Sequence, residues 1–239
     1  MKSSFAKFQT GGKRSQQRRR DKIQGDMAPP VISQQAANIF RITHRDNIPW
    51  ILDNGLHCPN SPVCDPNFVP IGHPEIIETR RSRNVPIAPG GTLADYVPFY
   101  FTPYSPMLYN IVTGWGVQRR RRDEIVIIWT SLPTLQEAET PFVFSDQHGV
   151  TVLADFHNDL ARLDRIAWDI LEARDFRRDP LDPLKFERYQ AEALVHRAIE
   201  VDQIRGFVCY DQAVRDNVRM EALARGIQAS IEAKPSWYL

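Results

Sequence analysis

The longest uninterrupted apolar run in this 239-residue chain is residues 125–129, Ile-Val-Ile-Ile-Trp. A membrane-spanning helix needs about 20 consecutive apolar residues, so we expect neither a transmembrane segment nor a membrane partner. A short apolar run is instead typical of a strand that is buried on both faces. The chain is therefore expected to fold as a globular domain built around short strands.

Short strands and short helices alternate irregularly after residue 37. Strands are predicted at residues 39–42, 96–101, 125–129, 142–144, 193–195 and 207–210. Helices are predicted at residues 46–54, 74–81, 105–112, 156–170, 185–190 and 214–222. Ser105 followed by Pro106 is a typical helix start, and Asp155 is the expected cap of the helix at 156–170. This order predicts an α+β sandwich rather than a doubly wound parallel sheet.

The charge is distributed unevenly along the chain. The net charge is +1, but residues 1–22 hold eight Lys and Arg against Asp21, which gives this segment +7 and the remainder −6. Such a polar segment buries too little apolar surface to offset its ordering entropy. We therefore expect a basic, disordered arm at residues 1–37, followed by one domain at 38–239. The arm is suited to nucleic acid phosphates, although a solvated terminus without a partner has the same composition.

The cysteines and histidines predict neither a disulfide framework nor a metal site. Three cysteines are an odd number, and no secretory signal precedes them, so we expect a reducing, cytoplasmic location. His57, Cys58, Cys64 and His73 are of the types that bind zinc, but their spacing matches no closed ligand pair. We predict that the protein binds no metal.

Two groups of arginines are candidates for binding phosphate. One is Arg80, Arg81 and Arg83 at the end of a predicted helix, and the other is residues 119–122. Guanidinium groups bind phosphate in a bidentate manner, so either group is suited to a pyrophosphate or a nucleic acid backbone. The alternative is a solvated surface, which the acids Asp123 and Glu124 favour for the second group. We give the first group the greater functional weight because it follows the long loop at 56–73.

Glu192 stands at a predicted helix-to-strand junction, between Ala191 and Ala193. Burial at this position would desolvate its carboxylate and suit it to electrostatic or acid–base catalysis. Taken alone, a single glutamate is more often a surface residue.

Several blocks of sequence, in order along the chain, resemble the DarT family of DNA ADP-ribosyltransferases. They are FRITHRDN (40–47), GGTL (90–93), DYVPFYF (95–101), SPMLY (105–109), PFVFSDQHGV (141–150) and QAEALVH (190–196). The resemblance covers residues 38–239. It implies an ADP-ribosyltransferase-like fold, in which two twisted antiparallel sheets with flanking helices pack together and bind NAD in the cleft between them.

The resemblance also implies roles for individual residues. Glu192 and Arg81 match the family's catalytic residues. The residues expected to bind NAD are Arg41, Thr43, His44, Asn47 and Arg81, with the segment 63–83 covering the dinucleotide. The residues expected to contact DNA are His148, Arg80, Arg83 and Tyr109.

By the same resemblance, the protein is expected to be a toxin that transfers ADP-ribose from NAD to a base in single-stranded DNA and releases nicotinamide. Thymidine is the expected acceptor, and a macrodomain antitoxin is the expected partner. A base modified on its Watson–Crick edge must be unpaired, which favours single-stranded DNA. The alternatives are the same chemistry on guanine, RNA or protein, and a non-catalytic nucleic-acid-binding module.

Overall fold

The computed structural model describes residues 30–239 as an eight-stranded sheet, a two-stranded sheet and helices around them. The large sheet has the strand order β10-β9-β4-β1-β3-β7-β5-β6, and the small one pairs β2 with β8. Within the large sheet all neighbours are antiparallel except β9 and β10. The predicted α+β class with antiparallel sheets is confirmed.

The elements have the following bounds. The strands are β1 (Asn38–His44), β2 (Leu56–His57), β3 (Tyr96–Tyr100), β4 (Ile125–Ser131), β5 (Phe142–Ser145), β6 (Phe156–His157), β7 (Glu192–His196), β8 (Ala198–Ile199), β9 (Gly206–Cys209) and β10 (Ser230–Ala233). The α-helices are α2 (Ile48–Asn54), α3 (Pro74–Ser82), α4 (Pro106–Thr113), α5 (Leu132–Glu137), α6 (Trp168–Glu172), α7 (Lys185–Tyr189) and α8 (Gln212–Ala224). Short 3-10 helices include η1 (Arg45–Asn47), η2 (Leu93–Asp95), η3 (Arg122–Glu124) and η4 (Leu160–Arg165).

The large sheet consists of two halves that meet at one residue pair. β1 pairs with β4 along its whole length, whereas β1 and β3 are joined only at Phe40 and Tyr100. On the other side, β3 pairs with β7 over five residues, which places Tyr100 opposite Glu192. The predicted catalytic glutamate therefore lies next to the junction of the two halves.

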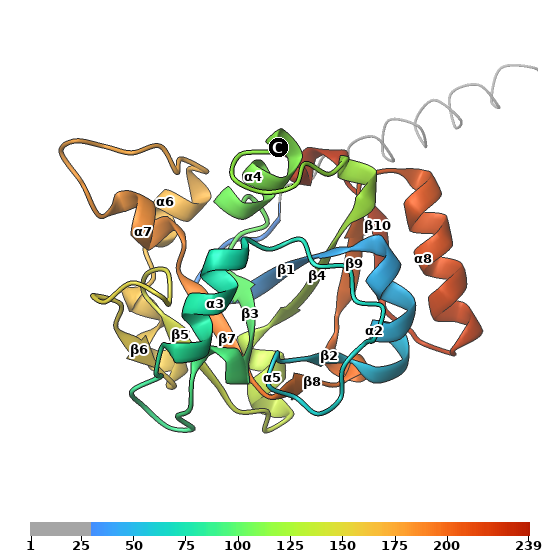
Figure 1. Ribbon diagram of the computed structural model, residues 1–239, viewed down its shortest axis with the longest axis horizontal. Coiled ribbons are helices and arrows are strands. Elements are labelled where there is room, and N and C mark those ends of the chain that lie inside the picture. Colours follow the sequence, from blue (N-terminus) through green and yellow to red (C-terminus); the bar gives the residue numbers. More distant parts are fainter. Residues whose placement is uncertain (1–29) are drawn as a thin grey trace, which may run out of the picture.

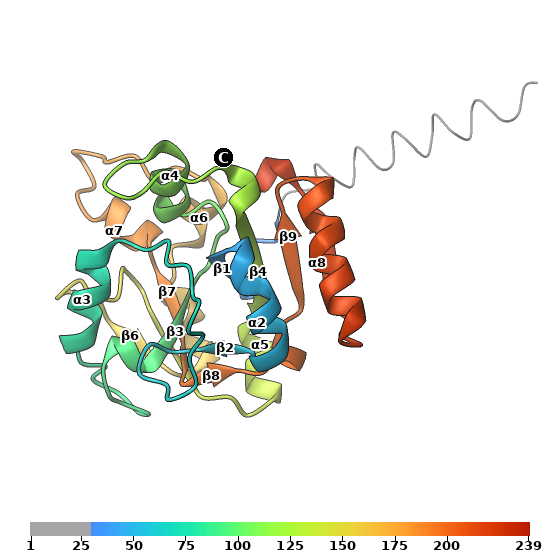
Figure 2. The same cartoon turned by 45° about the vertical axis from the view of Figure 1, so that its right-hand side comes forward.

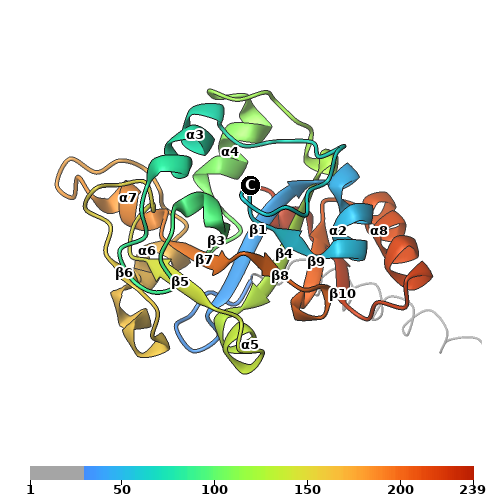
Figure 3. The same cartoon turned by 60° about the horizontal axis from the view of Figure 1, so that its bottom comes forward.

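The helices cover the sheet at both ends (Figure 1). α2 and α8 lie beside β9 and β10, and α6 and α7 lie near β5 and β6 at the opposite end. Figure 2 shows α3 and α8 on opposite sides of the strands. Figure 3 shows α3 and α4 on one side of the strands and α5 on the other. No helix within the described residues has the length and apolar content needed to cross a membrane.

The core forms around the strands that the apolar pattern predicted. Residues 125–128 are fully buried, as expected for a strand with both faces covered. Ser105 caps α4 by accepting a hydrogen bond from the backbone N–H of Leu108. These predictions are confirmed.

The helix predicted at 156–170 was wrong. Phe156 and His157 form β6 against β5, and the backbone N–H of Asp155 donates to the Asp146 side chain instead of Asp155 capping a helix. Asp159 caps the short η4 that follows. In this segment, pairing with β5 and hydrogen bonds from aspartate side chains to the backbone are favoured over the helix that the apolar spacing predicted.

The predicted basic arm lies almost wholly outside the described residues, because the structure describes nothing before residue 30. Ile32 and Ala37 are buried in the main core cluster. The boundary at 37/38 stays a prediction.

Candidate active site

Glu192 is a buried carboxylate at the start of β7. Only 2% of its side chain is exposed, and both of its oxygens accept hydrogen bonds from Arg80 Nη1, at 2.9 and 3.2 Å. His148 Nδ1 lies 3.7 Å from Glu192 Oε1. A buried charge is stable only when it is paired and hydrogen-bonded, and these contacts satisfy that requirement. The burial that would suit Glu192 to catalysis is therefore present, although the residue pattern alone favoured a surface position.

Arg80 reaches Glu192 from α3. This helix begins at Pro74, a residue suited to the first turn, and it has no fully buried residue. The Arg80 side chain is nevertheless only 11% exposed because it points at Glu192. Its neighbour Arg81 is 63% exposed and forms an ion pair with Glu78 at 3.5 Å. The structure thus brings Arg80, rather than Arg81, into contact with the predicted catalytic carboxylate.

Arg41 of β1 is a second, partly buried cation near Arg80. Its Nη1 donates to the carbonyl of Pro98 at 2.9 Å. Burial lowers the pKa of Arg41 to about 10, and the charge of Arg80 contributes to this shift. The two guanidinium groups repel each other, and an anion placed between or beside them would relieve this repulsion.

Unpartnered donors in this region fit a dinucleotide. Within the described residues, Arg41 Nε and Arg80 Nη2 are buried and have no hydrogen-bond partner. His44 Nε2 is also buried without a hydrogen-bond partner, but it faces the Glu124 carboxylate, whose Oε1 lies 3.7 Å away. His44 Nδ1 accepts from the backbone N–H of Asp46 at 3.2 Å, so the proton of the neutral ring lies on Nε2. NAD carries diphosphate and ribose oxygens that accept hydrogen bonds from such donors.

Thr43 and Asn47 fasten the long loop at 56–73 to the end of β1. Asn47 Nδ2 donates to Thr43 Oγ1 and to the carbonyl of Val69, each at 3.0 Å. Asn47 Oδ1 accepts from the backbone N–H of Val69 at 2.8 Å. These bonds position the loop that precedes α3 and Arg80. The direct contacts with NAD that the resemblance implies for Thr43, His44 and Asn47 stay predictions.

Arg83 connects α3 to the chain segment between β5 and β7, residues 146–191. Its Nε and Nη2 donate to the carbonyls of Gly149 and Thr151, at 3.3 and 2.9 Å. Gly149 packs so closely that a Cβ there would lie 3.1 Å from Glu192 Oε2. Of the residues predicted to contact DNA, Arg80 and His148 therefore face Glu192, and Arg83 holds the neighbouring backbone.

The remaining predicted residues lie further out. Tyr109 is exposed on α4, with its ring packed edge-on against Phe176 of the 146–191 segment. Tyr100, opposite Glu192, is partly buried, and its hydroxyl donates to Met107 Sδ at 3.4 Å. Burial raises the pKa of Tyr100, and the charge of Glu192 raises it further. Within residues 30–239 no cluster of three His, Cys, Asp or Glu residues is arranged to hold a metal ion.

No sequence pattern indicates the contact between Arg80 and Glu192, which joins residues 112 positions apart. The close approach of Gly149 to Glu192 was also missed. The sequence signal for this approach was the glycine directly after His148, because a glycine has no Cβ and lets the backbone come close to a neighbouring side chain.

Comparison with solved structures defines the class of protein. DarT from Thermus sp. 2.9 in complex with ADP-ribosylated ssDNA superposes with a TM-score of 0.79 at 31% identity, covering 89% of this chain and 100% of the other. The same Thermus protein in complex with NAD+ gives a TM-score of 0.75 with the same coverage. Fold and site thus define an NAD-dependent DNA ADP-ribosyltransferase, with NAD as co-substrate.

The sequence comparisons agree. A DNA ADP-ribosyl transferase from Escherichia coli O127:H6 is 49% identical over 87% of this chain and 95% of that protein. Another from Thermus sp. 2.9 is 38% identical over 75% of this chain and 84% of that protein. The model of the family "ssDNA thymidine ADP-ribosyltransferase, DarT" matches residues 40–239. The chain belongs to the DarT family, and the resemblance noted in its sequence is confirmed.

Proposed function

We propose that this chain transfers ADP-ribose from NAD to a thymidine base in single-stranded DNA and releases nicotinamide. The observation that carries the proposal is the buried Glu192 carboxylate, held by Arg80 and flanked by His148, in a chain of the DarT family. The name of that family includes thymidine, and the similar Thermus protein was solved with ADP-ribosylated ssDNA.

The chemistry assigned to Glu192 is electrostatic. When the bond between ribose C1′ and nicotinamide breaks, positive charge develops on the sugar ring. A preorganised carboxylate in a dry site stabilises that charge more than it stabilises the ground state. Arg80 keeps the carboxylate in one orientation by donating to both oxygens.

The arginines are assigned to the diphosphate. Arg41 Nε and Arg80 Nη2 are buried donors without a partner within the described residues, and Arg81 lies exposed one position further along α3. A guanidinium remains protonated at neutral pH, so Arg81 acts in this scheme by neutralising diphosphate charge rather than by removing a proton from the base. His44, Thr43 and Asn47 are assigned to the nicotinamide and its ribose.

The biological role is proposed from family membership alone. The chain would act as a toxin in the cytoplasm, and a macrodomain antitoxin would remove the modification. Expression in a bacterial host tests the toxin role: the wild type should stop growth, and Glu192→Ala should not. Growth arrest by both proteins, or by neither, would contradict it.

The acceptor is tested by incubating the full chain with NAD and single-stranded oligonucleotides that differ in base content, then measuring intact mass. The proposal expects the gain of one ADP-ribose only on oligonucleotides that contain thymidine. A gain on thymidine-free DNA that contains guanine would identify guanine as the acceptor. Modification of RNA or of protein alone would replace the proposed substrate.

A further inference from the structure

The loop between α4 and β4, residues 114–122, displays a tryptophan to solvent. Trp115 is 75% exposed, and it stands between Gly114 and Gly116, which both have positive φ, at +84° and +69°. This backbone conformation strains any residue with a Cβ. The two glycines therefore permit the tight backbone turn that leaves the Trp115 side chain in solvent. We call residues 114–122 the Trp115 loop.

The Trp115 loop is held firmly at both ends. The backbone N–H of Trp115 donates to the Asn110 carbonyl, and that of Arg120 donates to the Ile111 carbonyl, at 3.0 and 2.9 Å. Two positions after the tryptophan, Val117 packs against the core cluster beneath α4. The loop thus buries its small apolar residue and exposes its large one. An aromatic ring exposed on a fixed backbone offers a face on which a nucleic acid base can stack.

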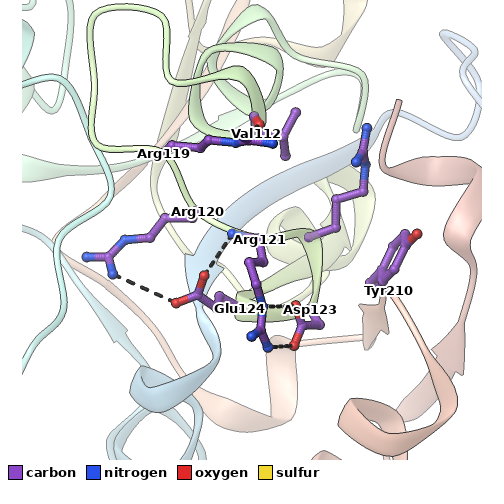
Figure 4. Close-up of a pocket in the computed structure, with 8 residues that line it drawn as sticks. Val112, Arg119, Arg120, Arg121, Asp123, Glu124 and Tyr210 are labelled. Atoms are coloured by element: carbon purple, nitrogen blue, oxygen red, sulfur yellow. Dashed lines mark hydrogen bonds and ion pairs between the residues drawn. The ribbon is translucent and has the colours of Figure 1, made fainter.

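Four arginines, Arg119–Arg122, follow the tryptophan and line a pocket of about 500 Å³ together with Tyr210. Figure 4 shows Arg121 bonded to Asp123, and Arg120 paired with Glu124.

Of the other two arginines, Arg119 has no carboxylate partner within the described residues. It donates to the carbonyl of Val112, whereas Arg122 donates to the carbonyl of Tyr238 and to the main-chain oxygen of Leu239, the last residue of the sequence. Among the ion pairs between residues 30–239, none includes Arg119. The carbonyl acceptor holds the Arg119 side chain in place without cancelling its charge, so this part of the surface attracts anions.

The Trp115 loop lies next to the elements of the active site. A Cβ at Gly116 would be 3.6 Å from Nε2 of His73, the residue that precedes α3 and its Arg80. On α4, Tyr109 packs against Phe176 of the 146–191 segment. Two exposed aromatic side chains, Tyr109 of α4 and Trp115 of the loop that follows it, therefore lie on the part of the chain next to α3 and the 146–191 segment.

We propose that the Trp115 loop binds the single-stranded DNA that flanks the modified base, with one base stacked on Trp115 and a phosphate near Arg119. The combination of a stacking aromatic residue and a fixed cation suits single strands of any sequence, because every base has a π-face and every nucleotide a phosphate. This inference rests on the proposed function, since it presumes a DNA acceptor, and it extends that function to a second contact outside the catalytic site.

The experiment compares wild type, Trp115→Ala, Trp115→Phe and the control Met220→Ala, an exposed apolar residue on α8. Fluorescence anisotropy without NAD measures the Kd for thymidine-containing strands of about 5 and about 15 nucleotides, a range that spans typical single-strand site sizes. Trp115→Ala should raise the Kd for the longer strand about 10-fold and change that for the shorter one little. Trp115→Phe should restore most of the affinity, and Met220→Ala should match the wild type.

The charges are tested with Arg119→Gln against the control Arg219→Gln, which removes an exposed arginine from α8. Plots of log Kd against log salt concentration should show that Arg119→Gln reduces the slope by about 1, as expected for one lost phosphate contact. The slope for Arg219→Gln should equal that of the wild type.

Three results would overturn the inference. The first is an unchanged Kd for the longer strand in Trp115→Ala, and the second is no binding of single-stranded DNA by the wild type. The third is a raised KM for NAD in Trp115→Ala without a change in DNA affinity, which would assign the loop to the dinucleotide. If the wild type binds the strands and depends on Trp115 but transfers no ADP-ribose to them, the proposed function fails and the inference stands.

Discussion

Replacing Arg80 with alanine tests how Glu192 is held. Arg80 Nη1 contacts both carboxylate oxygens, at 2.9 and 3.2 Å, and the two side chains are only 11% and 2% exposed. The variant leaves a buried carboxylate whose remaining polar neighbour is His148 Nδ1, at 3.7 Å. We expect the free energy of unfolding to fall because one partner of a buried pair has been removed while the other charge stays.

The size of this loss follows from measured buried pairs. Removing one partner typically costs about 3–5 kcal/mol, and water that enters the space left by the Arg80 side chain will solvate Glu192 and favour the lower end. For a domain of this size, about 3 kcal/mol corresponds to a Tm lower by about 6–12 °C. Transfer should slow by about 100-fold, because Glu192 loses its fixed orientation.

The assay is a double-mutant cycle with Arg80→Ala, Glu192→Gln and the double variant, followed by thermal and urea unfolding. Glu192→Gln removes the carboxylate charge that Arg80→Ala leaves unpaired. The free energy of unfolding lost in the double variant should therefore be smaller, by about 1–3 kcal/mol, than the sum of the losses in the two single variants. Arg81→Ala, on the exposed side of the same helix, is the matched control and should leave Tm unchanged. Additive losses, or equal Tm values for Arg80→Ala and Arg81→Ala, would refute this reasoning.

Three further predictions concern the surroundings of the site. Arg81→Ala loses only an exposed ion pair with Glu78, so the fold should be unaffected. The KM for NAD in a glycohydrolysis assay should rise about 10-fold. An unchanged KM would show that Arg81 does not contact NAD. Asn47→Ala should lose the bonds to Val69 and make residues 56–73 more sensitive to proteolysis, whereas an unchanged cleavage rate would show that the loop is held elsewhere. The backbone N–H of Thr92 lowers the pKa of Asp95, so this carboxylate stabilises the fold above its ordinary pKa and the benefit is lost as the pH falls. Asp95→Asn should therefore cost about 1–2 kcal/mol at neutral pH and less at about pH 3, and a cost independent of pH would contradict this.

The sequence predicted those parts of the fold that local patterns determine. The uninterrupted apolar run at 125–129 predicts a strand with both faces buried, because it offers no polar face to solvent. The Ser105-Pro106 pair predicts a helix start because the Ser105 hydroxyl accepts a hydrogen bond from the first turn of the helix. The helix expected at 156–170 failed because its apolar spacing competes with pairing to β5, a partner that sequence spacing does not reveal.

The choice between Arg80 and Arg81 shows where prediction of the site reached its limit. Adjacent helical residues point about 100° apart, so the rotation of α3 about its axis decides which arginine meets Glu192. Amphipathic spacing normally reports that rotation, but α3 has no fully buried residue to report it. Glu192 was singled out by the resemblance of its sequence block to the DarT family, because its flanking alanines alone did not distinguish a buried carboxylate from a surface one.

The most direct measurement of the central claim is the single-turnover rate of ADP-ribose transfer to a thymidine-containing strand by wild type and Glu192→Ala, with Tm and the Kd for DNA measured on the same samples. The carboxylate acts on charge that develops in the transition state, so its removal should slow transfer by about 100-fold or more while the fold and DNA binding persist. A rate equal to that of the wild type in the folded variant would contradict the account.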